Sequence, residues 1–547
     1  MRLVLELFRH SGWLLLLAIL TGLIGGLSNA GLVALAAQAL TASTSELIWL
    51  AAGFFGLCAA TFLARSGSQI MLHSMTQDLV LQLRISLCRR IIETPLNKLQ
   101  QIGKPELLAI LTSDIDRFVN SASLLPIGFI NLIIIGACFG YLAIHSFILF
   151  AIFCLFFALG IACFRMLEQK PIAQLTVVRT QTDALYRHFR SLIEGSKELQ
   201  LNARRAAWFI DELLAPAAVM FRDSLLAAQN AYTWTINVGN ILFYLVLGFT
   251  IFLLPLASPL PPEVRLTGTL LVLYLIEPIA ALLGTLPGLR QADISLKRIR
   301  QFGDTLDQLR ESRPVASDPF AGTRPLRIEA TGICHRLPGP AASSAFRIGP
   351  IDLSISQGDI LFVTGGNGSG KTTLAMLLLG LYQPEAGSIE LNGVKVTKDN
   401  IGHYRARFSA VFADFHLFET LLEVDEESFT QRGQRYLEAL AMAAKVSIHQ
   451  GRFSTTDLSS GERRRLALVS AYLEDRDVYF FDEWGADQDP TFRHIFYTEL
   501  LPALKQRGKT TIVVSHDERY FGVADQLLRL EGGRLLPPLP GYATLVR

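Results

Sequence analysis

A chain of 547 residues is too long for a single hydrophobic core and predicts at least two domains. Half of the residues are hydrophobic, 18% are charged and the mean hydropathy is +0.36, which is typical of a membrane protein. The formal net charge of +2 is too small for the whole protein to attract nucleic acid, so we expect no nucleic-acid partner.

The cysteines show neither a CxxC pair nor the spacing of metal ligands, and four of them lie in apolar runs. They are Cys58, Cys88, Cys138, Cys154, Cys163 and Cys334. We interpret them as small core hydrophobic residues and expect no disulfide framework.

The first half of the chain contains six segments that meet the need of a spanning helix for about 20 mostly apolar residues. They are Gly12–Ala39, Leu47–Ala64, two back-to-back spans within Phe118–Phe164 that turn near Ile144–Ser146, Tyr232–Pro255 and Leu266–Leu289. The first of them is far longer than the apolar core of about 7–15 residues in a secretory signal, so we predict a mature helix.

Lysine and arginine are concentrated on one side of the predicted membrane. Arg65–Arg117 carries seven of them and Arg165–Asp223 carries nine, whereas the connections on the other side contribute only Arg265. The positive-inside rule therefore places both segments, the N-terminus and everything after the sixth span in the cytoplasm. We expect helices to continue out of the membrane and to turn near Lys104–Ala109 and Lys197–Asn202, where a cytoplasmic motor would contact them.

One acid, Glu277, stands beside Pro278 near the middle of the sixth predicted span. A carboxyl group at that depth is costly and usually faces a cavity or a partner. Glu277 is therefore a candidate for binding substrate or a proton on a transport pathway. The alternatives are a protonated or hydrogen-bonded acid at a helix kink made by Pro278, and a position nearer the membrane surface.

The composition changes after Arg290, where a charged amphipathic segment leads into a linker rich in Pro, Gly, Ser and Asp. We predict an all-α transmembrane domain of six helices over residues 1–300, a linker over 301–325 and an α/β domain over 326–547. Strands are expected at Leu326–Ala330, Ile351–Ile355 and Ile360–Thr364.

The strand Ile360–Thr364 leads directly into a phosphate-binding loop of the pattern G-x-x-x-x-G-K-[ST], and a helix is predicted over Thr373–Leu381. The glycines let backbone N–H groups close around the phosphates of ATP, and the helix N-terminus adds its positive dipole. Lys371 is expected to reach the β- and γ-phosphates, and Thr372 to bind Mg²⁺. The predicted nucleotide-binding residues here are Gly365, Gly366, Asn367, Gly368, Ser369, Gly370, Lys371, Thr372 and Thr373.

Two acids follow the buried apolar strand Val478–Phe481. Ligands bind at the carboxyl edge of parallel sheets, so Asp482 is the expected Mg²⁺ ligand. Glu483 points differently and is the expected general base for the attacking water. The alternative is that both acids cap the following turn, and the presence of the phosphate loop argues against it.

A third motif, Leu458–Glu462, stands 24 residues before the first of these acids and opens a helix. It resembles the LSGGQ signature of ATP-binding cassette proteins, with Ser460 and Glu462 in place of the usual Gly and Gln. A lone serine here is an ordinary helix cap. The resemblance implies that Ser459 and Gly461, with Ser460 between them, bind the γ-phosphate of ATP held by the partner subunit.

The same resemblance assigns His516, which follows the strand Thr511–Ser515, to the γ-phosphate. The predicted catalytic set is therefore Glu483, His516 and Lys371. Asp489 is the safest match within the loop that bridges two cassettes in the family.

Two positions depart from the family pattern. Ala413 falls where the family has a glutamine, so that role is empty or passes to Asp414. His335 falls where an aromatic ring stacks on adenine, and an imidazole offers less area than a tyrosine. Neither change removes a group that is assigned to bond cleavage, so we expect hydrolysis to persist at a reduced rate.

The chain as a whole resembles an exporter-type half-transporter of the ATP-binding cassette superfamily. A narrower set of motifs is similar to the bacterial cyclic-peptide exporters, including those for peptide siderophores such as pyoverdine precursors and for microcin-type lasso peptides or lipopeptides. These motifs are Phe346–Leu353, Gly365–Lys371, Phe408–Phe412, Glu198–Asn202 and Asp482–Pro490. The resemblance implies a multi-pass protein of the bacterial inner membrane, outward transport, and an amphiphilic peptide-like substrate in contact with membrane lipid.

One chain supplies one phosphate loop and one signature, whereas a working site needs both to face each other. We therefore expect a homodimer with two composite ATP sites, in which hydrolysis through Glu483 resets the membrane helices. Three alternatives stay open: another cargo such as lipid, drug or a different peptide, import of a siderophore, and an ATP-binding membrane sensor with little hydrolysis, which Ala413 favours.

Overall fold

The computed structural model describes residues 2–40, 42–257, 261–311, 317–322, 325–337, 346–421 and 426–537. The chain divides into two compact units, each described here by itself. The first comprises residues 1–87 and 108–302, and the second comprises residues 88–107 and 303–547.

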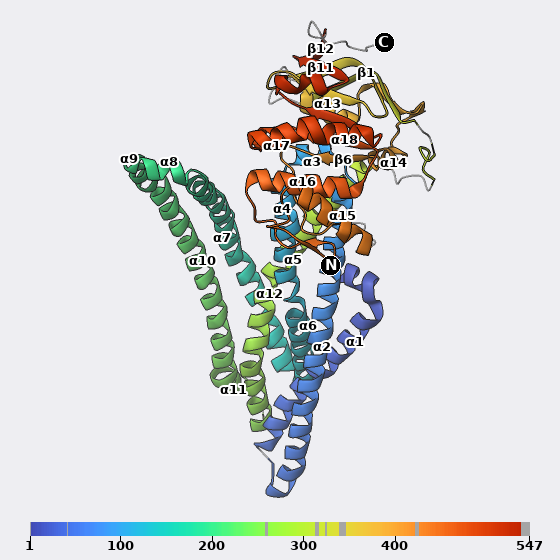
Figure 1. The fold of residues 1–547 in the computed structure, drawn as a ribbon. Coiled ribbons are helices and arrows are strands. Elements are labelled where there is room, and N and C mark those ends of the chain that lie inside the picture. The colour runs from blue at the N-terminus through green and yellow to red at the C-terminus, as the bar shows by residue number, and fades with distance from the viewer. Residues whose placement is uncertain are drawn as a thin grey trace. The chain divides into compact units, whose positions relative to one another are not determined.

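Long helices form the first half of the chain (Figure 1). They are α1 Arg2–Ala39, α2 Thr44–Ile92, α3 Leu96–Ile102, α4 Lys104–Ala109, α5 Ile115–Ala122, α6 Leu125–His145, α7 Phe147–Glu194, α8 Ser196–Leu201, α9 Ala203–Trp208, α10 Ala215–Gly248, α11 Leu254–Ala257 and α12 Pro262–Leu309, with π-helical turns at Ile110–Asp114, Phe209–Leu214 and Phe249–Leu253. Within the described residues, six helical segments are long and apolar enough to cross a membrane. The predicted number of spans is therefore confirmed.

The turn between the third and fourth spans lies where the sequence places it. α6 ends at His145 and α7 begins at Phe147, with Ser146 extended between them at φ −159°. The Ser146 hydroxyl accepts a hydrogen bond from the N–H of Leu149 at 3.4 Å, and so caps α7.

Of the two predicted cytoplasmic turns, one is correct and one is misplaced. The turn near Lys197–Asn202 is the short helix α8, which lies between the long neighbouring helices α7 and α10 (Figure 1). The turn expected near Lys104–Ala109 is instead α4, because Pro105 sits in the first helical turn, where proline is tolerated. The chain turns just before that segment, at the two ends of α3, where Pro95 has no N–H to continue a helix and Gly103 has a φ of +91°.

Two further expectations concern single residues of this half. Cys138 is buried, but Cys88 is exposed on α2, so its interpretation as a core residue is wrong. Cys88 lies near the end of α2, well beyond the predicted span Leu47–Ala64. α12 runs unbroken through Pro278, which is buried, while Glu277 is exposed on the single chain. The role of this acid stays a prediction.

The second unit contains two main sheets. The antiparallel sheet has the order β2-β1-β4-β5, and the larger sheet has the order β12-β11-β3-β10-β9-β6. The strands are β1 Arg327–Leu337, β2 Phe346–Ser356, β3 Ile360–Thr364, β4 Ala386–Leu391, β5 Val394–Lys395, β6 Phe408–Val411, β7 Ile448–His449, β8 Arg452–Phe453, β9 Val478–Asp482, β10 Thr510–Val514, β11 Gln526–Glu531 and β12 Arg534–Leu536. The helices are α13 Lys371–Leu378, α14 Ile401–Arg405, α15 Glu426–Ala439, α16 Ser460–Glu474, α17 Pro490–Ile495 and α18 Leu501–Gln506.

The strands that carry the predicted motifs are parallel neighbours. Val514 of β10 lies opposite Val363 of β3 on one side and Asp482 of β9 on the other. β6 extends the same arrangement, since its Val411 lies opposite Phe481. The carboxyl ends of β3, β10, β9 and β6 therefore lie at one edge of the sheet, as the sequence predicts for the phosphate loop and the acids.

The short helix α3 packs on the second unit. Leu96 contacts the hydrophobic cluster that includes the buried Tyr382, and the Tyr382 hydroxyl donates a hydrogen bond to Gln100. The segment between α2 and α4 is thus part of the unit that carries the phosphate loop.

A single arginine links the end of α12 to the helix that follows the phosphate loop. Arg405 forms a two-pronged ion pair with Glu311, at 2.7 and 2.8 Å, and donates to the carbonyl of Gly380 at 2.9 and 2.6 Å. Gly380 lies two residues beyond α13. The N–H of Glu311 also donates to the carbonyl of Glu93, just after α2, at 3.0 Å.

We predict that Glu311→Ala lowers the stability of the second unit. The Glu311 side chain is only 12% exposed, so its loss leaves the partly buried Arg405 without its main partner. The expected cost is about 2 kcal/mol, or a melting temperature lower by about 5 °C in the purified full chain. Glu329→Ala removes the exposed ion pair with Arg327 and is the control, which we expect to leave the melting temperature unchanged. Equal melting temperatures for both variants would contradict the assignment.

Candidate active site

The phosphate-binding loop has the backbone that its glycines permit. Gly365, Gly368 and Gly370 have φ values of +147°, +76° and +105°, in the region that favours glycine. A Cβ on Gly365 would lie 2.1 Å from the carbonyl oxygen of Leu530. The loop therefore reaches the start of α13 only with glycine at this first position.

The remaining residues of the loop divide into an exposed and a buried set. Gly366, Asn367, Gly368 and Thr372 are exposed, while Ser369, Lys371 and Thr373 are buried. The hydroxyl of Ser369 is buried and finds no hydrogen-bond partner among the described residues, which fits a loop shaped to bind a polar ligand.

Lys371 lies folded over the loop. Its ammonium group donates to the carbonyl oxygens of Gly365 at 2.8 Å and Gly366 at 3.0 Å. Burial lowers the pKa of this lysine, and the negative charges of Glu483 and Asp482 oppose the shift. The sheet thus brings the predicted lysine and both predicted acids within electrostatic range of one another.

Asp482 ends β9 and is buried. Burial raises its pKa, and the charge of Glu483 adds to this, while a hydrogen bond from the N–H of Ala413 and the charge of Lys371 oppose it. Mg²⁺ typically binds to one or two carboxylates together with the phosphates of a nucleotide. A buried carboxylate beside the phosphate loop, with the exposed Thr372 at the start of α13, fits a Mg²⁺ ion that is bound in this way.

Glu483 lies immediately beyond β9 in an unusual backbone conformation. Its φ is +49°, a value that is uncommon for a residue other than glycine. Its carboxylate is 3.2 Å from Nε2 of His516, which follows β10. The structure therefore joins the predicted base to the predicted γ-phosphate ligand, and leaves both side chains partly exposed toward a water or a phosphate.

The substituted signature begins α16. The hydroxyl of Ser459 accepts from the N–H of Glu462 at 3.4 Å, and the Glu462 carboxylate accepts from the N–H and the hydroxyl of Ser459 at 3.0 and 2.8 Å. This arrangement is a capping box, which forms with either glutamate or glutamine. Glu462 therefore still satisfies the backbone at the start of α16. Hydrogen bonds from Lys445 and Ser459 lower the pKa of Glu462 to about 2.

The signature is tied to the loop that follows Glu483. Gln488 donates from its side-chain amide to the carbonyl of Gly461 at 2.9 Å, and a Cβ on Gly461 would lie 3.0 Å from the carbonyl oxygen of Asp487. Ser460 is the first residue of α16 and is exposed, as a contact to a partner's nucleotide requires. Asp489 caps α17 by accepting from the N–H groups of Thr491 and Phe492.

His335 has a different environment from the one that adenine stacking suggests. It is 6% exposed, its ring centroid is 5.3 Å from that of Tyr382, and its Nδ1 is 3.1 Å from the carbonyl of Gln383. Tyr382 therefore already occupies one neighbouring position, and stacking on adenine stays a prediction. The sequence does not single out Phe346 as a residue that stacks on adenine. Its ring nevertheless lies beside the phosphate loop, within 3.4 Å of where a Cβ on Gly370 would be.

Ala413, which stands at the position of the missing glutamine, takes part in the site through its backbone. Ala413 is exposed and its N–H binds the Asp482 carboxylate, while the exposed Asp414 raises the pKa of Asp482 through its charge. Sequence reasoning missed Arg464, which is buried and donates to carbonyls of Ala413 and Glu483. The run Arg463–Arg465 directly after the signature is the signal that would have indicated it, since adjacent side chains on a helix point in different directions and one of them can turn toward the sheet.

Comparisons with known proteins agree with this geometry. A family model described as ABC transporter matches residues 348–486. The chain is 36% identical over 535 residues to ATP-binding protein SyrD of Pseudomonas syringae pv. syringae, which covers 95% of this chain and 93% of that protein. It is 29% identical over 283 residues to an ATP-dependent lipid A-core flippase of Alkalilimnicola ehrlichii, which covers 48% and 46% of the two chains. A solved structure of a bacterial Atm1-family ABC exporter with ATP bound is similar in fold, with a TM-score of 0.73 at 18% identity over 97% of this chain and 95% of that one.

We predict that Gly365→Ala abolishes nucleotide binding. The added Cβ meets the Leu530 carbonyl at 2.1 Å and requires a φ that alanine rarely adopts, so the loop must move by more than an ångström. Binding of a fluorescent ATP analogue to the full chain measures the loss, and we expect a fall in affinity of at least about tenfold. Gly522→Ala is the control, because Gly522 is exposed outside the phosphate loop and no heavy atom lies within 4 Å of a Cβ there. Equal affinities for the two variants would show that the loop tolerates the side chain.

We predict that Glu483→Gln removes ATP hydrolysis and preserves ATP binding. The amide keeps the shape of the side chain but has no basic oxygen to accept the proton of the attacking water. Steady-state ATPase in membranes should fall by about 10²–10⁴-fold, the range that a general base contributes. Undiminished turnover in this variant would remove Glu483 from the base position.

Proposed function

We propose that this chain, which belongs to the ABC transporter family, exports a cyclic peptide, a peptide siderophore or its precursor from the cytoplasm to the periplasm across the bacterial inner membrane. The family membership makes it an ATPase whose hydrolysis is coupled to transport, and its fold is that of a six-helix exporter followed by a nucleotide-binding domain. The observation that carries the proposal is the presence in one chain of six apolar spans and a complete set of Lys371, Asp482, Glu483 and His516 at one sheet edge.

Hydrolysis in this proposal needs two copies of the chain. The phosphate loop of one copy and Ser459, Ser460 and Gly461 of the other would enclose each ATP, with Mg²⁺ held by Thr372 and Asp482. The exposed start of α16 supports this arrangement. Closure of the two sites would reach the spans through α3, which contacts Tyr382 within the second unit.

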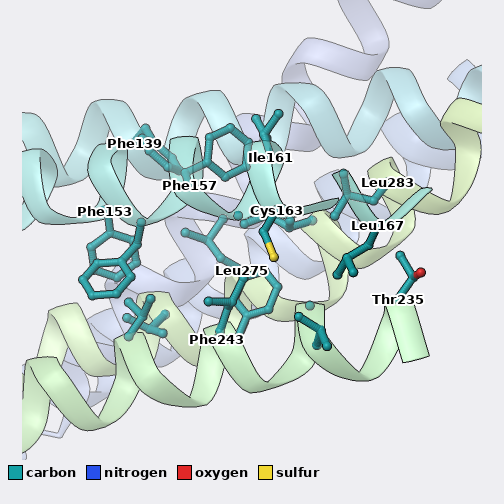
Figure 2. A pocket seen from close by; sticks show the side chains of 18 residues that line it. Phe139, Phe153, Phe157, Ile161, Cys163, Leu167, Thr235, Phe243, Leu275 and Leu283 are labelled. Atoms are coloured by element: carbon teal, nitrogen blue, oxygen red, sulfur yellow. The ribbon is translucent and has the colours of Figure 1, made fainter. Parts of the chain in front are cut away.

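An apolar cavity in the membrane unit supports an amphiphilic cargo. Its enclosed volume is about 60 Å³, which is less than the roughly 300–1,000 Å³ of a whole small-molecule site and is enough for a small apolar group. Figure 2 shows side chains of α6, α7, α10 and α12 around it. The lining includes Phe139, Phe153, Phe156, Phe157, Phe243, Leu275, Thr235 and Cys163, and among its described members none carries a formal charge. Such a cavity suits the hydrocarbon part of a cargo, whereas Glu277 is a candidate for its polar part.

Two other functions have specific support and are separable by experiment. Lipid transport is favoured by the likeness to a lipid A-core flippase over about half of the chain. A sensor that binds ATP and hydrolyses it slowly is favoured by the alanine at position 413.

Proteoliposomes that contain the purified chain test the proposal, because ATP added outside reaches only cassettes that face outward. We expect ATP to drive a fluorescent cyclic lipopeptide into the lumen and the same peptide to stimulate ATPase activity. Movement of preloaded peptide out of the lumen would favour import, movement of labelled phospholipid alone would favour lipid transport, and the absence of any stimulation would favour the sensor. Glu483→Gln is the inactive control.

The cavity itself is tested by Gly239→Leu on α10. No heavy atom lies within 4 Å of a Cβ at Gly239, which lines the cavity, so a leucine there adds apolar volume to the cavity wall. We expect about a tenfold increase in the peptide concentration that half-maximally stimulates ATPase, with basal ATPase unchanged. The control Gly248→Leu lies on the same helix, also in open space, and does not line the cavity. Equal responses of the two variants would separate the cavity from cargo binding.

A further inference from the structure

One buried guanidinium contacts two loops of the active site at three points. Arg464 lies on α16, four residues past the start of the helix, and its side chain is 10% exposed. It donates from Nη1 to the carbonyl of Glu483 at 2.5 Å, and from Nη2 to the carbonyl of Ala413 at 3.4 Å. Nη2 is also 3.0 Å from the carboxylate of Asp487. These three partners belong to the position of the missing glutamine, the general base and the segment after the base.

The contact is reciprocal. Nη1 of Arg464 also approaches the carbonyl of Trp484 at 3.4 Å, and the indole N–H of Trp484 donates to the backbone carbonyl of Arg464 at 3.0 Å. Trp484 is 1% exposed and stacks on Phe496 with the ring centroids 4.4 Å apart. Helix α16 and the loop after β9 therefore hold each other in place, and the indole ring is buried in the core.

A second arginine holds the rest of the same loop, which we call the base loop, residues Glu483–Gln488. Arg493 donates to the carbonyls of Gly485 at 3.0 Å, Ala486 at 3.2 Å and Gln488 at 3.3 Å. Among the side chains that the structure describes, Arg464 is the one that donates to the carbonyls at positions 483 and 484, and the Glu483 carbonyl also accepts from the N–H of Ala486 at 3.1 Å. Arg464 is therefore the side chain that holds the part of the loop that carries the base.

We propose that Arg464 is a positioning residue for ATP hydrolysis, which holds Glu483 in its productive conformation and connects it to the Ala413 loop. The inference deepens the proposed function, because it rests on Glu483 as the base. Arg464 touches no reacting atom and acts through the backbone of Glu483.

Two physical reasons support this role. The left-handed φ of +49° at Glu483 is unfavourable for a side chain with a Cβ, and the short hydrogen bond from Arg464 to its carbonyl stabilises that conformation. The arginine also places a permanent positive charge 3.0 Å from the carboxylate of Asp487, which lies in the same loop as the base. The side chain of Ala413 ends at Cβ and has no polar group. The backbone carbonyl of Ala413, which accepts a hydrogen bond from Arg464, therefore connects that loop to the base loop.

Steady-state ATPase of the purified full chain with its membrane domain tests the proposal. Arg464→Gln should lower kcat by about 10–100-fold and leave KM for ATP within about threefold, because positioning affects the chemical step and not the binding of phosphates. Arg464→Lys keeps the charge but cannot reach all the acceptors, so we expect an intermediate kcat. Arg463→Gln changes an exposed neighbour on the same helix and should retain normal activity.

The double variant Arg464→Gln with Glu483→Gln separates positioning from an independent effect. If Arg464 acts through Glu483, its loss should cost nothing more once the base is removed. A further fall in kcat, or a kcat near the original in Arg464→Gln, would overturn the proposal. Normal turnover of Glu483→Gln alone would instead contradict the base assignment and so the proposed mechanism.

Folding defects are distinguished by melting temperature and by binding of an ATP analogue. Arg464→Gln with normal binding and a low kcat supports a positioning role. If that variant does not fold, Arg464→Lys decides the matter: a folded Arg464→Lys with the original kcat would overturn the proposal, and one with a reduced kcat and unchanged KM would support it.

Discussion

The parallel pairing of β3, β10 and β9 is the constraint on which the active site depends. Because Val514 lies between Val363 and Asp482 in register, the phosphate loop, the acids and His516 emerge at one edge of the sheet from segments far apart in the chain. Convergence places a buried lysine beside two carboxylates, and their opposite charges offset part of the cost of burial. Fixed strands also make the glycines of the loop necessary, since Leu530 of the adjacent strand leaves no room for a side chain at Gly365.

Around that edge the backbone is stabilised by side chains from α16 and α17. Arg464 and Arg493 take the free carbonyls of the base loop, and Gln488 binds the signature helix at Gly461. The loop therefore has few unsatisfied polar groups although it lies outside the sheet and is bent at Glu483. Strain at a functional residue persists when its surroundings determine its conformation, and here hydrogen bonds from two arginines provide that determination.

The spans, the phosphate loop and the acids were predictable because their signals are local. A run of apolar residues is enough to indicate a span, and Gly365–Thr372 after a buried strand is enough to indicate a phosphate loop. The turn near α3 was misplaced because two prolines, Pro95 and Pro105, offer the same local signal, and only the packed structure shows which one ends a helix. Arg464 was missed because its importance depends on loops 51 and 19 residues away in the chain.

The contacts of Arg405 have a thermodynamic consequence. One guanidinium holds Glu311, two residues beyond α12, and Gly380, just past the helix of the phosphate loop. A change in the direction of α12 at this end must therefore either displace α13 or break the hydrogen bonds of Arg405. Two sites joined in this way are energetically linked, and linkage is reciprocal. Whatever a bound nucleotide does to the contact between Glu311 and Arg405, that contact does to the affinity of the phosphate loop for the nucleotide.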